Sequence, residues 1–326
     1  EGEEELRCLT GNLVVSLGSG SDKLYVGGYS TGEWITGTDA PAAVTEGDSI
    51  DLGPGDDELY IVLSDEVPTK LDGGDGRDSL TIAISNLTEL TFEAAGATNF
   101  EILVGSRNSE TIKGNDRDNV LSGAAGTDIL YGYAGNDSLY ADYIDADCKN
   151  VSGSDDDSLF GGDGNDLLCG SRGENTLDGG TGTDTMIGGP EVDTFIIRAG
   201  DGSTSLDQAD VITDFEDGTD LIGLDNGLTF DDLTITQGTS DNANHTIVRL
   251  GDEYLLILQN IATENLTVAD FDSTVTEDQT LTGTTADNIL LGGAGNDTIS
   301  AGAGSDQVYA RGGDDTIVVS GKTGSF

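Results

Sequence analysis

Residues 161–169 read GGDGNDLLC, and their pattern recurs every nine residues along much of the chain. Between residues 105 and 196 there are nine such units, interrupted once by an eleven-residue insertion at 141–151. The first six positions of a unit are polar and rich in glycine, which permits the positive φ of a tight turn, and the sixth is usually Asp. The last three positions are polar, apolar and variable, which predicts a very short strand with one inward side chain.

One inward apolar residue per nine is too little for a globular core. Stacked in register on neighbouring turns, however, these residues form a thin continuous core, which is the construction of a solenoid. The expected core positions are the eighth residues of the units: Ile112, Leu121, Leu130, Leu139, Leu159, Leu168, Leu177, Met186 and Phe195.

A second array follows near the end of the chain. Cut from Thr282 to Val318, it gives four units with one extra residue, Leu291, and expected core residues Ile289, Ile299, Val308 and Ile317.

The charge of the chain limits its partners. It has 13 Lys and Arg against 62 Asp and Glu among 326 residues, a formal net charge of −49. Nucleic acids and anionic membrane surfaces repel such a chain, so its expected partners are cations. The longest apolar run, Tyr254 to Leu258, is far too short to span a membrane.

The nonapeptides resemble those of the repeats-in-toxin (RTX) family, whose pattern is GGxGxDxUx with U a large apolar residue. Residues 161–168 match it at every fixed position. The resemblance implies an all-β fold, a right-handed parallel β-roll with two nonapeptides per coil. It also implies several calcium ions between successive turns, bound by turn-glycine carbonyls and by the position-six carboxylates. Such hard oxygen ligands at flexible turns suit Ca²⁺ better than Mg²⁺.

Alternate turns fall on opposite edges of such a roll, so the position-six residues form two ladders. Glu110, Asn119 and Asn175 depart from the pattern, and the alternative for every site is an Asp that is merely solvated in a turn. The implied ligands of the first array are Asp128, Asp137, Asp157, Gly162, Gly164, Asp166, Gly180, Gly182, Asp184 and Asp193. Those of the second array are Asp287, Gly293, Gly295, Asp297, Asp306 and Asp315, and isolated units add Asp22, Asp57 and Asp78.

The flanking regions complete a four-part organisation. We expect an irregular β-solenoid with scattered units at 1–104, the β-roll at 105–197, a β-rich cap at 198–279 and a second short roll at 280–326. Residues 210–222 are similar to the DxIxDFxxGxDxI segment that closes RTX rolls. More weakly, residues 1–104 resemble bacterial and cyanobacterial surface-layer proteins and RTX adhesins. Because the second array has no cap after it, we expect either a longer protein or an end that pairs with another molecule.

The three cysteines allow at most one internal disulfide. On the roll, Cys169 lies one coil beyond Tyr140, and Tyr140 directly precedes the insertion that carries Cys148. A Cys148–Cys169 disulfide is therefore within reach in an oxidising compartment, and two free thiols are the alternative. Cys8 stays single.

Catalytic motifs are sparse. His245 is the only histidine, so a zinc-protease HExxH motif is absent. A GxSxG string at residues 28–32 lacks the helix that a serine-hydrolase elbow requires, and chance explains it better. Paired carboxylates occur throughout and fit calcium better than glycoside hydrolysis.

We therefore expect a secreted, non-catalytic calcium-binding protein with a structural or adhesive role at the bacterial cell surface. It would fold on binding calcium and assemble with itself in a surface layer or fibre, and the resemblance implies type I secretion. One alternative is the calcium-binding part of a secreted enzyme whose catalytic domain lies outside this chain. Another is an adhesin for cell-surface polysaccharide, with Trp34, Tyr131, Tyr133 and Tyr140 as candidate stacking residues.

Overall fold

The computed structural model of the chain describes a protein built almost entirely of β-strands. The described residues are 3–6, 14–17, 19–26, 29–30, 33–34, 49–62, 70–84, 88–92, 97–145, 148, 154–273, 280–286, 288–293 and 295–318. They contain no α-helix, only strands and four short 3₁₀ helices. The chain divides into two compact units, Glu1–Gly180 with Ile187–Pro190, and Thr181–Met186 with Glu191–Phe326. The four-part division expected from the sequence stays a prediction.

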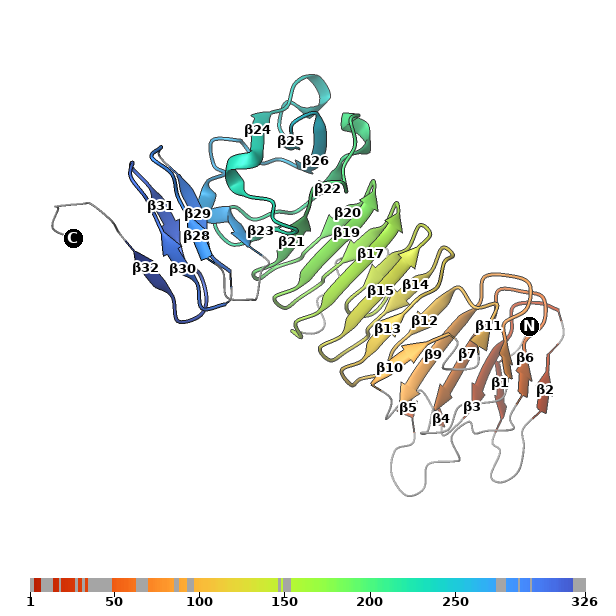
Figure 1. Cartoon of the computed structure of the whole chain (residues 1–326). Helices are drawn as coiled ribbons and strands as arrows, with labels where there is room; N and C mark the ends of the chain where they lie inside the picture. Colours follow the sequence, from red (N-terminus) through yellow and green to blue (C-terminus); the bar gives the residue numbers. More distant parts are fainter. Residues whose placement is uncertain are drawn as a thin grey trace. The chain divides into compact units, whose positions relative to one another are not determined.

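In the first unit, successive coils stack with their strands parallel (Figure 1). One sheet has the order β1 (Glu3–Leu6), β3 (Lys23–Val26), β7 (Glu58–Val62), β9 (Ser79–Ile84), β12 (Ile102–Val104), β14 (Val120–Ser122), β16 (Ser138–Tyr140) and β18 (Leu167–Cys169). A second sheet has the order β10 (Glu89–Thr91), β13 (Thr111–Lys113), β15 (Ile129–Ala134), β17 (Ser158–Gly164) and β19 (Thr176–Gly182).

The N-terminal coils carry further strands. A third parallel sheet has the order β11 (Ala97–Thr98), β8 (Lys70–Asp72), β6 (Ser49–Asp51) and β2 (Val14–Ser16), and β4 (Tyr29–Ser30) pairs antiparallel with β5 (Glu33–Trp34).

The core of the first unit is the predicted column of position-eight residues. Leu121 pairs in register with Leu139, and Leu139 with Leu168, and all three are fully buried. The column continues into the N-terminal region, where Leu103 and Leu80 take the same place. One inward residue per strand is thus buried because every coil covers the next, as expected of a solenoid.

The second unit begins with parallel strands and continues into an antiparallel hairpin. One group comprises β20 (Thr185–Ile187), β22 (Asp210–Ile212), β26 (Glu253–Leu258), β25 (Thr246–Leu250) and β24 (Leu233–Gln237), with β24, β25 and β26 antiparallel to one another. Another comprises β21 (Thr194–Ile197), β23 (Leu221–Leu224) and β27 (Phe271–Ser273). The 3₁₀ helices are η1 (Leu206–Gln208), η2 (Phe230–Asp232), η3 (Ser240–Asn242) and η4 (Val268–Asp270).

The second array forms two small parallel sheets. Their strands are β28 (Thr280–Thr282), β30 (Thr298–Ser300) and β32 (Thr316–Val318) in one, and β29 (Ile289–Leu291) and β31 (Gln307–Tyr309) in the other. Leu290, not Ile289, pairs with Val308. The expected frame for the first unit was therefore wrong by one residue: the unit starts at Gly283, and Leu291 is its ninth residue rather than an extra one.

Candidate metal sites

The position-six carboxylates of neighbouring coils are linked by hydrogen bonds. The backbone N–H of Asn119 donates to Asp137 Oδ1, and the N–H of Asp137 donates to Asp166 Oδ1, both at 2.7 Å. On the opposite edge, Glu110 donates to Asp128 and Asp128 to Asp157 in the same way, also at 2.7 Å. Each turn therefore fixes the side chain of the next, and the two predicted ladders exist as continuous hydrogen-bonded series within the first unit.

The ladder on the Asn119 edge extends into the N-terminal region. The backbone N–H of Asp22 donates to Asp57 Oδ1 at 2.7 Å, and that of Asp57 donates to Asp78 Oδ1 at 2.8 Å. The N–H of Asp78 donates to Glu101 Oε2 at 2.9 Å. The sequence indicated Asp22, Asp57 and Asp78 only as isolated units, and Glu101 was missed because it precedes β12 without a glycine-rich turn. These coils carry the same carboxylate series as the regular repeats.

Two further members come from the second unit. The backbone N–H of Asp184 donates to Asp210 Oδ1 at 2.9 Å, and the backbone N–H of Asp193 donates to Asp220 Oδ1 at 3.1 Å. Asp210 and Asp220 are both buried. The sequence contained a signal for them, since Asp210 and Asp220 directly precede the apolar residues of β22 and β23.

Some of these carboxylates bury their second oxygen without a hydrogen bond. The Oδ2 atoms of Asp57, Asp78, Asp128 and Asp137 are buried and have no hydrogen-bond partner. Each of these side chains is no more than 2% exposed. Burying an ionised carboxylate without compensation is costly, so the arrangement calls for a cation or a proton.

The glycine at position one makes room for this oxygen. A Cβ on Gly132 would lie 2.4 Å from Asp137 Oδ2 and 2.5 Å from the carbonyl oxygen of Gly161 on the next coil. A Cβ on Gly123 would lie 2.4 Å from both Asp128 Oδ2 and the carbonyl oxygen of Ala141. Carboxylate and carbonyl oxygens thus converge beside these two glycines, in a space that a Cβ there would enter, and this donor set fits calcium.

The other turn glycines bring backbone carbonyls between the coils. Gly162, Gly164, Gly180 and Gly182 all have positive φ. A Cβ on Gly164 would lie 1.6 Å from the Gly135 carbonyl oxygen, and one on Gly180 would lie 2.2 Å from that of Gly162. Among the described residues, no three acidic side chains gather closely enough to hold an ion by themselves. Turn carbonyls would therefore supply part of any coordination shell.

Burial dominates the electrostatics of the ladders. It raises the pKa of Asp128 to about 8 and those of Asp137 and Asp157 to about 7. It raises the pKa values of Asp78 and Asp166 to about 6. Neighbouring carboxylates add to each of these shifts. The metal-free fold therefore favours protonated carboxyl groups, and a bound cation would reverse that preference.

In the second array the ladders are shorter. The backbone N–H of Asn288 donates to Asp306 Oδ1 at 3.1 Å, and that of Asp297 donates to Asp315 Oδ1 at 2.8 Å. The corrected frame places Asn288 rather than Asp287 at position six. Asp287 lies outside the described residues, so its role as a ligand stays a prediction. Gly293 and Gly295 are buried in their turn, and a Cβ on Gly313 would lie 2.1 Å from the Gly295 carbonyl oxygen.

Cys148 and Cys169 form a disulfide in the structure, with Cα atoms 5.5 Å apart. Together with Val120 and Tyr140 they form a buried apolar cluster. Cys8 lies outside the described residues.

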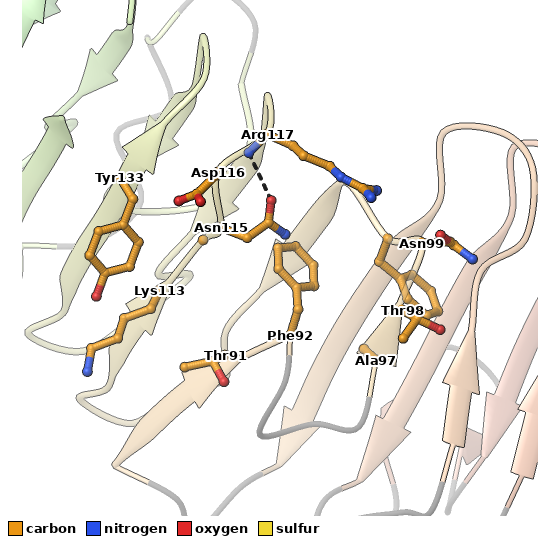
Figure 2. A pocket seen from close by; sticks show the side chains of 12 residues that line it. Thr91, Phe92, Ala97, Thr98, Asn99, Lys113, Asn115, Asp116, Arg117 and Tyr133 are labelled. Carbon is orange, nitrogen blue, oxygen red and sulfur yellow. Dashed lines mark hydrogen bonds between the residues drawn. The ribbon is translucent and has the colours of Figure 1, made fainter. Parts of the chain in front are cut away.

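Two of the candidate stacking residues, Tyr131 and Tyr133, lie together with their rings stacked and centroids 6.0 Å apart. Tyr140 is buried in the cluster with the disulfide, and the Tyr131 ring stacks on Phe160 with centroids 4.9 Å apart. Tyr133 is 47% exposed and lines a groove of about 820 Å³ with Lys113 and Arg117 (Figure 2). The side chain of Trp34 lies outside what the structure describes.

The structure describes the residues considered for catalysis only in part. Gly28 and Gly32 lie outside the described residues, while Ser30 belongs to β4. His245 Nδ1 accepts a hydrogen bond from the Asn260 N–H at 3.0 Å, which gives the ring a structural role between two turns.

Comparison with known sequences supports the metal-binding interpretation. The sequence profile of the RTX calcium-binding nonapeptide repeat matches four segments, 104–142, 151–177, 170–195 and 282–317. These segments are RTX calcium-binding repeats. No curated protein matches the chain. Within the described part, no helix is long and apolar enough to cross a membrane.

Three solved structures are distant likenesses of the chain. The AlgE6R3 subunit of the Azotobacter vinelandii mannuronan C5-epimerase is 22% identical over 51% of this chain and 79% of its own, with a TM-score of 0.21. The extracellular lipase LipA of Serratia marcescens is 17% identical over 60% of this chain and 44% of its own, with a TM-score of 0.26. A hyperactive, Ca²⁺-dependent, β-helical antifreeze protein from an Antarctic bacterium is 17% identical over 97% and 70%, with a TM-score of 0.22. At these TM-scores the likenesses carry no argument about function.

Proposed function

We propose that this RTX β-roll protein is secreted, is not catalytic, and folds when calcium fills the oxygen sites between its turns. The observation that carries the proposal is the series of buried Oδ2 atoms without hydrogen-bond partners, at Asp57, Asp78, Asp128 and Asp137. A divalent cation at each turn would compensate these charges and would draw turn carbonyls of adjacent coils together. Binding energy then becomes folding energy.

The same charges keep the metal-free chain open. With a formal charge of −49, a chain at low calcium is repelled by its own carboxylates and buries too little apolar surface to collapse. At the millimolar calcium of an extracellular medium, sites with dissociation constants on the order of 10⁻⁴ to 10⁻³ M are filled. The chain is thus fit for export in a loose state and folds outside the cell.

We place the folded protein at the bacterial cell surface, in a surface layer or fibre. Support comes from its parallel strands, which present sheet edges suited to pairing with further chains, and from the weak N-terminal resemblance to surface-layer proteins and adhesins. The calcium-binding part of a larger secreted enzyme stays the alternative.

A calcium titration of the stripped full chain tests both proposals. Circular dichroism and light scattering are followed together, with magnesium as the control ion. A cooperative gain of β signal specific to calcium supports ion-coupled folding, and a parallel rise in scattering supports assembly. A stripped protein that is already fully folded and does not respond to calcium would overturn the central proposal.

The groove at Tyr133 favours saccharide binding as a second candidate function. Tyr133 occupies position two of its turn with a φ of 78°, a conformation that is strained for a bulky residue, and its ring is exposed beside Lys113 and Arg117. An exposed aromatic face with planar polar groups around it suits a sugar ring. Binding to a glycan array that is lost in Tyr133→Ala but kept in Tyr143→Ala, another exposed tyrosine, supports this function. Equal behaviour of the two variants argues against it.

A further inference from the structure

Asp142 occupies a place in the first array where the nonapeptide pattern has a glycine. Ala141 stands at position one of its turn, since its N–H donates to the Cys169 carbonyl at 2.9 Å and its own carbonyl faces Gly123. Asp142 is therefore at position two, as Gly162 and Gly180 are in their units. Its backbone carbonyl accepts a hydrogen bond from the Ser122 hydroxyl at 2.7 Å, which fixes the main chain there.

The carboxylate of Asp142 is buried without compensation. The residue is 2% exposed, and its Oδ2 has no hydrogen-bond partner. Among the described residues, it takes part in none of the ion pairs to Lys or Arg. Asp142 is not a position-six residue, so the ladder does not account for it.

Other carboxylates gather around the same turn. Asp155 Oδ2 accepts from the Gly126 N–H at 3.2 Å, so this side chain bridges to the turn one coil earlier. Asp155 interacts electrostatically with Asp142 and Asp128, and Asp142 does so with Asp157. Negative charge is concentrated here more than at a regular turn.

The next coil lacks the usual charge. Asp157 donates its N–H to Asn175 Oδ1 at 3.0 Å, so an amide stands where the ladder normally has a carboxylate. Asp157 therefore has the neutral Asn175 as its ladder partner on the next coil. Asp142, at position two, supplies a second carboxylate near Asp157 instead.

We propose that Asp142 is a calcium ligand of a site found only at the turn that carries the insertion, together with Asp157 and backbone carbonyls of the adjacent turns. This inference rests on the proposed calcium-dependent function. Because calcium affinity in oxygen sites rises with the number of charged ligands and with rigidity, Asp142 restores to this site the charge that Asn175 lacks.

The insertion supplies the rigidity. Tyr140, two residues before Asp142, packs with Val120 and with the Cys148–Cys169 disulfide in the buried apolar cluster. Both ends of the segment from Tyr140 to Cys148 are therefore held against β14 and β18. The Asp142 carboxylate is positioned before the ion arrives, which lowers the entropy lost on binding.

The test is a competition titration of calcium against a chromophoric chelator on the full chain, comparing wild type with Asp142→Asn. We expect the variant to lose one site, or to bind one calcium ion about tenfold or more weakly. Asp145→Asn is the matched control, because it removes the same charge from the same insertion, and it should keep the wild-type profile.

The outcomes separate the two proposals. If wild type binds no calcium, the proposed function fails. If wild type binds and Asp142→Asn has the same site number and affinities, only the inference fails. Loss of binding to the same extent in Asp145→Asn would also overturn it, because a general charge effect would then explain the result. Circular dichroism at saturating calcium verifies folding, and Asp142→Ser repeats the comparison if the Asn variant is unfolded.

Discussion

The two repeat arrays follow one pattern but are buried to very different degrees. In the first array Leu130, Leu159 and Leu168 are fully buried, whereas in the second only Ile299 of the core column is, and Ile317 is 50% exposed. Asp128 and Asp137 are buried, while Asp306 and Asp315 are partly exposed. A solenoid core exists only where a coil is covered on both sides, and the described part of the second array has three strands on one face and two on the other.

The largest expected difference between the two arrays is in how much calcium each needs to stay folded. Because the second array buries little apolar surface, ion binding must supply a larger share of its stability. As calcium is lowered, amide hydrogens of β29 to β32 should therefore lose protection before those of β13 to β18. Hydrogen exchange followed by mass spectrometry at stepped calcium measures this order. Simultaneous loss in both arrays would mean that burial does not set the calcium requirement.

A low pH should substitute for calcium in stabilising the first array, because protons neutralise the same buried carboxylates. The carboxyl pKa values of Asp128, Asp137 and Asp157 rise from 3.8 in the unfolded chain to about 7 or 8 in the metal-free fold. The folded state thus binds protons more tightly, and this stabilisation is complete below about pH 4 and lost as the pH rises through about 7 to 8. Calcium affinity should fall as the pH is lowered, because protons compete with calcium for the same carboxylates.

Circular dichroism of resin-stripped protein at pH 5 and at pH 8.5 checks this prediction. We expect more β signal at pH 5, and calcium should add β signal mainly at pH 8.5. More β structure at pH 8.5 than at pH 5, without calcium, would contradict the assigned shifts.

The repeat pattern predicted the core and both ladders, because nine-residue spacing fixes which side chains point inward. It did not predict Asp142 or Glu101, since neither lies in a regular unit and their positions depend on how irregular segments stack. It also misplaced the first unit of the second array: with Ile289, Leu290 and Leu291 all apolar, the spacing alone did not determine the frame. Pairing with Val308 determined it.

Shortening a core side chain should destabilise the first array more than the second when calcium is bound. Leu159→Ala removes a fully buried side chain between two covering coils, and we expect it to lower the free energy of unfolding of the first array by about 2–5 kcal/mol. Ile317→Ala, at a half-exposed position, should lower that of the second array by less than about 0.5 kcal/mol. Urea titrations at saturating calcium, read locally by hydrogen exchange, give both values. A larger effect at Ile317 would indicate that the second array is covered by a partner in solution.

Replacing one ladder carboxylate should give an effect on stability that changes sign with calcium. Asp137→Asn keeps the Oδ1 acceptor for the Asn119 N–H but replaces the unpartnered Oδ2 with a neutral amide. Without calcium the variant should be more stable than wild type at pH 8, because a buried charge is gone, by about 1–3 kcal/mol. With calcium it should be less stable, because a charged ligand is gone.

Asp306→Asn in the second array, where the side chain is partly exposed, should show little gain in stability without calcium. Thermal unfolding of both variants with and without calcium measures the crossover. If Asp137→Asn destabilises the chain equally under both conditions, the carboxylate serves the hydrogen-bonded ladder alone and calcium is bound elsewhere.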